Sequence, residues 1–306
     1  MTATTLLRPL GAGDLLDGAV WLYRKNFLRF VLIVALLRVP LSALLSIFQG
    51  ASQQEPLAFS SLNLVGLALN HLLVATILSA VFAFAVNASV TAKPISVTYA
   101  YLQTARRFVR LLVNAVIANL AYATVLAVTG AAVLLVVLGV VNPFTAFDES
   151  GPLAFVAGVL LLPIYAAIIG LPLLYLDARW SVSQQAIALE GCSALSAFGR
   201  SATLMRGQYR RVMVFLLGLF LLGNLLSTGP SFVSQAVAES LSPAYNRTSW
   251  MGLAYLLFGT AIPTAFDLLF LPISYIARAL LYYDLRVRAE GLDLAVRIER
   301  WAEQPA

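Results

Sequence analysis

The sequence predicts an all-α, polytopic membrane protein with about six transmembrane helices. Of its 306 residues, 60% are hydrophobic and only 11% are charged, and the mean hydropathy is +0.87. Soluble domains carry about 25% charged residues, so this composition excludes an ordinary soluble protein. The single cysteine, Cys192, has no partner for an intrachain disulfide.

Six apolar runs reach, or nearly reach, the length of about 20 residues that crosses a bilayer core. They cover residues 28–48, 64–92, 111–141, 153–176, 212–228 and 251–283. The first run begins only near Phe27 and follows Asp14 and Asp17, whereas a signal peptide carries positive charge at that place. We therefore expect the first span to remain in the mature protein.

The basic residues indicate how the spans are oriented. The loops 50–61 and 142–152 and the segment 229–250 hold one basic residue, Arg247, and the other 19 of the 20 Lys and Arg lie toward the opposite side. By the positive-inside rule that side is cytoplasmic, and both termini lie on it. We expect a multi-pass protein of a bacterial plasma membrane, whose basic residues contact anionic lipid headgroups and not nucleic acid.

The spans follow a pattern that repeats three times. We infer three units of an amphipathic interfacial helix, an outward span and an inward span, over about 11–92, 95–179 and 192–286. The interfacial helices are expected to lie on the cytoplasmic leaflet. The units form a single membrane domain over 1–286, and an amphipathic cytoplasmic tail follows over 287–306.

Similar motifs mark the ends of the spans. The outward spans begin near an aromatic-x-Arg motif, and two inward spans close on an Asp-x-Arg motif. Arginines and acidic residues at such positions are expected to anchor the helices at the membrane interface. These predicted anchors are Arg29, Arg110, Arg211, Asp177, Arg179, Asp284 and Arg286.

Several stretches resemble a known family. They are LRPL at 7–10, GDLLDGA at 13–19, LYRKNF at 22–27 and YYDLRVRAEGLDL at 282–294. Together they resemble the bacterial membrane-domain family named after the membrane portion of glycerophosphoryl diester phosphodiesterase. The resemblance implies a stand-alone membrane domain. It does not carry over the hydrolase activity, because the name-giving enzymes hold their chemistry in a separate soluble barrel that this chain lacks.

Three ionisable residues inside the spans are the candidates for a functional site, because such residues are costly in the bilayer. We predict that Arg38 and Asp267 pair, either as a fastener between helices or on a substrate path. His71, beside Asn70, is expected to make an interhelical hydrogen bond or to belong to a polar path that relays protons.

No motif for nucleophilic, metal or acyl-transfer chemistry is present, so we predict a protein that is not an enzyme and has no cofactor. The leading interpretation is a scaffold, an accessory subunit or a lipid-interacting module, with membrane lipids and another membrane or cytoplasmic protein as partners. The alternatives are a transporter or channel-like component and, third, a membrane-embedded lipid enzyme.

Overall fold

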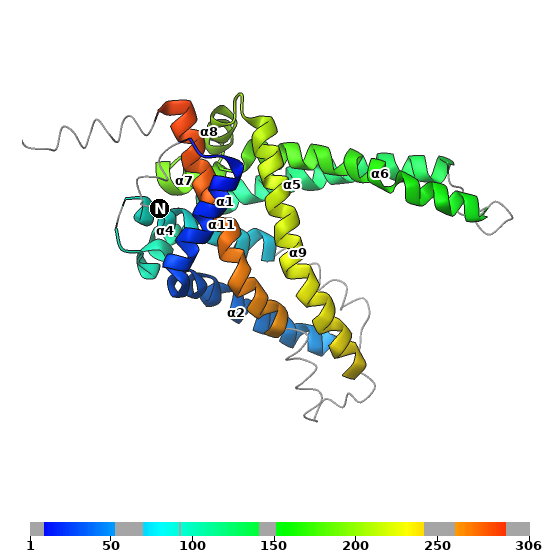
Figure 1. The fold of residues 1–306 in the computed structure, drawn as a ribbon, viewed down its shortest axis with the longest axis horizontal. Coiled ribbons are helices and arrows are strands. Elements are labelled where there is room, and N and C mark those ends of the chain that lie inside the picture. The colour runs from blue at the N-terminus through cyan, green and yellow to red at the C-terminus, as the bar shows by residue number, and fades with distance from the viewer. Residues whose placement is uncertain (1–8, 53–69, 92, 141–150, 242–260, 292–306) are drawn as a thin grey trace, which may run out of the picture.

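The computed structural model describes residues 9–52, 70–91, 93–140, 151–241 and 261–291, and all regular structure in these ranges is helical (Figure 1). Five of the described helices are long and apolar enough to cross a membrane, and their spans are Phe27–Leu44, Leu72–Val90, Val97–Leu135, Tyr209–Ser234 and Ile262–Glu290. The chain is therefore an α-helical membrane protein.

The first two helices, α1 (Ala12–Lys25) and α2 (Phe27–Ser52), are separated at Asn26. Asp14 caps the start of α1, because its Oδ2 accepts the Gly11 N–H at 3.0 Å. At the other end, the Asn26 N–H bonds the carbonyls of the last turn of α1. The first predicted interfacial helix is thus a separate element, which packs against α11.

The helix α4 (Thr76–Val90), which continues from a π-helical turn (Asn70–Ala75), is the centre of the fold. Every side chain from 78 to 86 is buried, and α4 contacts α5, α7 and α11. Phe82 stacks between Phe30 of α2 and Tyr275 of α11, with ring centroids 5.4 Å apart in both cases. A membrane helix covered by protein in this way is part of the core.

The long helices α5 (Val97–Val140) and α6 (Gly151–Trp180) run side by side and form an arm on the right of Figure 1. The prediction of a separate interfacial helix near the start of the second unit is wrong, because α5 is continuous from Val97. The physical reason is that Arg107, a good helix former, occupies the position that the poor helix former Asn26 has in the first unit. The helix α6 covers the fourth predicted span.

Two short helices, α7 (Ser183–Glu190) and α8 (Ser196–Leu204), lead into α9 (Tyr209–Leu241), and α11 (Ile262–Glu290) closes the described part. Left-handed glycines mark three of these boundaries: Gly191 after α7, Gly207 before α9 and Gly291 after α11. The third predicted interfacial helix, which corresponds to α8, is thus separate from the span that follows it. The predicted tail begins as the end of α11, and the rest of it lies outside the described residues.

Away from α4, the membrane-length helices expose large apolar side chains. Leu28 of α2, Leu135 of α5 and Leu225 of α9 are 73%, 71% and 74% exposed. Such extensive apolar exposure along helices of this length is expected where lipid covers them.

Candidate functional site

Arg38 of α2 and Asp267 of α11 form an ion pair. Arg38 Nη2 lies 2.5 Å from Asp267 Oδ2, and Arg38 Nε donates to the same oxygen at 3.1 Å. The two side chains are 22% and 15% exposed. The structure therefore brings together the two charges that the sequence predicted to pair, and the pair joins two membrane-length helices.

Asn70 and His71 belong to the π-helical turn that precedes α4. Their side chains lie outside the described residues, so the predicted hydrogen bond or proton path stays a prediction. A π-helical turn inserts an extra residue into the helix and is frequent at functional sites.

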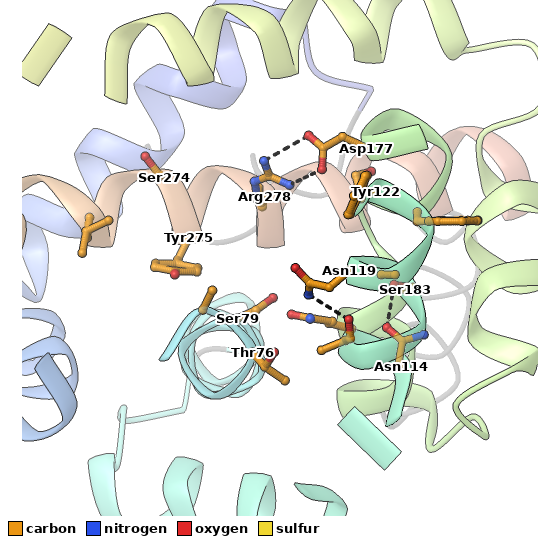
Figure 2. A pocket seen from close by; sticks show the side chains of 17 residues that line it. Thr76, Ser79, Asn114, Asn119, Tyr122, Asp177, Ser183, Ser274, Tyr275 and Arg278 are labelled. Carbon is orange, nitrogen blue, oxygen red and sulfur yellow. Dashed lines mark hydrogen bonds and ion pairs between the residues drawn. The ribbon is translucent and has the colours of Figure 1, made fainter. Parts of the chain in front are cut away.

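A polar cavity of about 390 Å³ lies between α4, α5, α11, the end of α6 and the start of α7. Its side chains are drawn in Figure 2. The polar and aromatic residues that line it are Thr76, Ser79, Asn114, Asn119, Tyr122, Asp177, Trp180, Ser181, Ser183, Gln184, Ser274, Tyr275 and Arg278. Polar groups from several membrane-length helices thus converge on one space.

The charged wall of this cavity is the ion pair between Asp177 of α6 and Arg278 of α11. Arg278 donates from Nη1 to Asp177 Oδ1 and from Nη2 to Asp177 Oδ2, each at 3.2 Å. The side chains are 31% exposed for Arg278 and 32% for Asp177. Asp177 was predicted as an interfacial anchor, and here it binds a neighbouring helix beside a cavity.

Two asparagines of α5 line the cavity in different ways. Asn114 is buried and fully engaged: its Nδ2 donates to the Ala194 carbonyl at 2.9 Å, and its Oδ1 accepts from Ser183 Oγ at 3.1 Å. Asn119 is exposed, and its Nδ2 donates back to the Ala115 carbonyl at 2.8 Å. Asn114 therefore holds α7 in place, whereas Asn119 presents its amide to the cavity.

Asp284 is the centre of a second polar cluster, near the end of α11. Its side chain is 0% exposed, and it accepts from Arg211 Nη1 at 2.7 Å, Arg288 Nε at 3.0 Å and the Leu10 N–H at 2.7 Å. Both arginines also donate to the Leu10 carbonyl. Asp284 and Arg211 were predicted as interfacial anchors, but for Asp284 this is wrong, because the N-terminal segment covers it.

Glu190, at the end of α7, connects α8 and α11. It accepts from Arg200 Nε at 2.7 Å and from Tyr282 Oη at 2.6 Å, and Arg286 lies 3.8 Å away. Burial acts to raise the pKa of Glu190, but the hydrogen bonds and the two arginine charges outweigh it and hold that pKa below its ordinary value. Arg286 also pairs with Glu290 at 2.9 Å.

The remaining predicted anchors lie at the surface. Arg29, Arg110 and Arg179 are exposed. Arg110 Nη1 donates to the Gly191 carbonyl at 3.0 Å, and Arg179 Nη1 donates to Tyr175 Oη at 3.2 Å. Their exposed positions suit contact with lipid headgroups.

The cavity offers hydrogen-bond donors and acceptors together with one positive and one negative charge. Such a lining suits a polar ligand of zero net charge. Among the residues that the structure describes, no group of three or more His, Cys, Asp or Glu is placed to hold a metal ion.

Arg278 is the main cavity residue that the sequence reasoning missed. It lies within the apolar run 251–283, as Asp267 does. The rule that ionisable residues inside a span mark functional sites therefore applied to it as well.

Comparison with known proteins identifies the family of the chain. No curated protein and no solved structure matches it. One family model matches residues 22–283, which include all the membrane-length helices described above except the last residues of α11. The chain therefore belongs to the family described as "Domain of unknown function (DUF7847)".

Proposed function

We propose that this protein is a non-enzymatic, lipid-interacting membrane module that binds the headgroup of a membrane lipid in the cavity between α4, α5 and α11. The observation that carries the proposal is a charged and hydrogen-bonding cavity of about 390 Å³ among helices of membrane length. Ligand sites commonly have volumes of about 300–1,000 Å³. Polar groups that converge inside a helical membrane domain are costly unless they have a partner.

The surroundings of Asn119 favour a lipid over a water-soluble ligand. Asn119 is exposed at the cavity, and the next residue along α5, Leu120, is 64% exposed. Val116, one turn earlier, is also exposed. A headgroup held at Asn119 would thus have apolar helix surface beside it, against which acyl chains can lie.

The orientation and the repeat belong to the same proposal. We propose that six spans in three units cross a bacterial inner membrane and that both termini are cytoplasmic. We also propose that the chain is related to the membrane domain of glycerophosphoryl diester phosphodiesterase, which it resembles. The exposed Arg29, Arg110 and Arg179 support this orientation. On the cytoplasmic leaflet they would meet anionic headgroups.

Filling the cavity tests the lipid-binding proposal. Ala118 lines the cavity, whereas Ala127 lies nine residues further along α5, on the opposite face, and is exposed. We expect Ala118→Phe to reduce the lipid that stays bound after detergent purification by about tenfold or more, as measured by native mass spectrometry. Ala127→Phe makes the same substitution outside the cavity, so it should retain wild-type levels.

Equal lipid retention in wild type, Ala118→Phe and Ala127→Phe would overturn the proposal, because bound lipid would then lie elsewhere on the surface. Thermal unfolding of each variant, followed by tryptophan fluorescence, separates lost binding from lost folding. If Ala118→Phe unfolds, Ala118→Leu gives the same test with a smaller side chain.

Cysteine labelling tests the orientation. Cys192 lies between α7 and α8 and is half-buried. Burial and the neighbouring Glu190 raise its pKa, so labelling requires alkaline buffer to form thiolate. We expect a membrane-impermeant maleimide to label Cys192 in inside-out vesicles and not in intact cells. Ser150→Cys in a Cys192→Ser background should show the reverse, and the opposite pattern would contradict the orientation.

Transport is the second candidate, and one feature of α11 favours it. Asp267, Ser274 and Arg278 are spaced by seven and four residues, which places them on one face of the helix. This row of polar side chains runs from the Arg38–Asp267 pair to the Asp177–Arg278 pair. In a transporter, Ser274→Cys, made in a Cys192→Ser background, would be labelled from both sides of the membrane. Labelling from one side or from neither would refute transport.

A further inference from the structure

The charge of the cavity restricts the lipid that it can hold. Asp177 and Arg278 are the residues in its lining with carboxylate or guanidinium groups, and the other polar side chains are amides, hydroxyls, phenols and an indole. The lining is therefore neutral overall. A ligand with a net charge would leave an unbalanced charge in the occupied cavity, where the surrounding helices partly exclude water, and this is unfavourable.

The Asp177–Arg278 pair can also form hydrogen bonds to a ligand. Its two N–O distances of 3.2 Å exceed the roughly 2.7–2.9 Å of strong charge-assisted bonds. By comparison, the N–O distance is 2.5 Å in the Arg38–Asp267 pair and 2.7 Å in the Arg211–Asp284 pair. About a third of each side chain at the cavity stays exposed. The bonds to Asp177 use two N–H groups of Arg278, and a guanidinium has five.

The neutral side chains are arranged so that both charges of a ligand can be bound. Figure 2 shows Asp177, Arg278 and Tyr122 along one wall, with Ser79 and Asn119 across the cavity. The rings of Tyr122 and Tyr275 are suited to contact an ammonium group. The Ser79 hydroxyl accepts from Gln185 Nε2 at 3.2 Å and can donate its own hydrogen to a ligand. The Asn119 amide uses one N–H for the Ala115 carbonyl and has a second N–H for a ligand.

We propose that the lipid bound in this cavity has a zwitterionic headgroup, with its phosphate at Arg278 and its ammonium at Asp177. This inference rests on the proposed lipid-binding function and names the headgroup class. The opposite charges of the ligand would replace the long bonds within the pair by shorter ones, and the net charge of the occupied cavity would remain zero.

Lipid competition on the wild-type protein gives the main test. Purified protein is equilibrated with equal amounts of phosphatidylethanolamine, phosphatidylglycerol and a neutral glycosyl diacylglycerol, and bound lipid is measured by native mass spectrometry. We expect at least a tenfold preference for phosphatidylethanolamine. Free glycerophosphoethanolamine carries the same phosphodiester and ammonium without acyl chains, so it distinguishes a lipid from a soluble headgroup. Displacement of the bound lipid by an equimolar amount would overturn a lipid ligand, and retention of the lipid supports one.

Single-charge variants give an independent readout. Asp177→Asn leaves Arg278 as the only charge of the cavity, so we expect the preference to move toward anionic phosphatidylglycerol. Arg278→Gln leaves Asp177, and both phospholipids should bind at least tenfold more weakly. Asp17→Asn is the matched control for Asp177→Asn, because Asp17 is an exposed aspartate outside the cavity, and it should keep the wild-type preference.

The possible failures can be told apart. If wild type prefers phosphatidylglycerol or the glycosyl lipid, and Ala118→Phe removes that lipid, the cavity binds lipid and the zwitterion inference is wrong. If Ala118→Phe removes no lipid, the proposed function itself fails. If the charge variants do not fold, the wild-type competition still decides.

Discussion

Replacing Asp284 by Asn should destabilise the protein by about 3 kcal/mol or more. Asp284 is fully buried and receives hydrogen bonds from Arg211, Arg288 and the Leu10 N–H. Asn can still accept from Leu10, but it cannot satisfy two guanidinium groups. Each hydrogen bond to a charged group is worth about 1.5–3 kcal/mol, and removing one partner of a buried ion pair costs about 3–5 kcal/mol.

The lower end of that range applies because the two arginines are 25% and 28% exposed and regain some hydration. Their bonds to the Leu10 carbonyl also remain. The assay is reversible unfolding in mixed micelles, followed by tryptophan fluorescence. Asp17→Asn is the control: Asp17 is exposed, and its substitution should change stability by less than about 0.5 kcal/mol.

A loss below about 1 kcal/mol in Asp284→Asn would refute the reasoning, because the arginines would then not depend on the carboxylate. Limited proteolysis gives a second readout. Since Asp284 and its arginines hold both polar groups of the Leu10 backbone, the variant should be cleaved faster near the N-terminus than the Asp17→Asn control.

Three further predictions concern other contacts. A double-mutant cycle with Arg38→Ala and Asp267→Ala should give a coupling free energy of about 1 kcal/mol or more in unfolding experiments. Zero coupling would contradict the view that the pair stabilises the contact between α2 and α11. The folded-state pKa of Glu190 is lower than its ordinary value of 4.5, so its stabilisation is complete above that value and is lost as the pH falls through the folded-state pKa. Melting temperatures should therefore fall with pH in that range, and less steeply in Glu190→Gln. Phe82→Ala should cost about 3–5 kcal/mol, and a loss below about 1 kcal/mol would indicate that α4 is not the core.

The sequence predicted the membrane helices well because an apolar run of given length has few alternatives to a span. Helices α2, α5, α9 and α11 each overlap a predicted run. The central position of α4 was not predicted, because hydropathy does not distinguish protein-covered from lipid-covered helices. The continuity of α5 was missed because an amphipathic stretch can belong to a separate helix or to a longer one.

The candidate site was only partly predictable, for a different reason. The pairing of Arg38 with Asp267 was predictable, because two opposite charges inside the spans relieve each other's cost. Asp284 was misread as an anchor, because its burial depends on Leu10, 274 residues away in the chain. The cavity depends on how five elements pack together, and no local pattern in the sequence specifies such packing.

Two ion pairs of α11, Arg38–Asp267 and Asp177–Arg278, differ in how much space surrounds them. Asp267 and Arg278 lie on one helix face, and each has a partner on another helix. The Arg38–Asp267 pair is short and mostly covered, so its bonds are already used in holding α2 to α11. The Asp177–Arg278 pair is longer, more exposed and open to the cavity. The same chemistry therefore serves as a fastener at one position and, we infer, as a ligand site at the other, and the difference is set by the space around the pair.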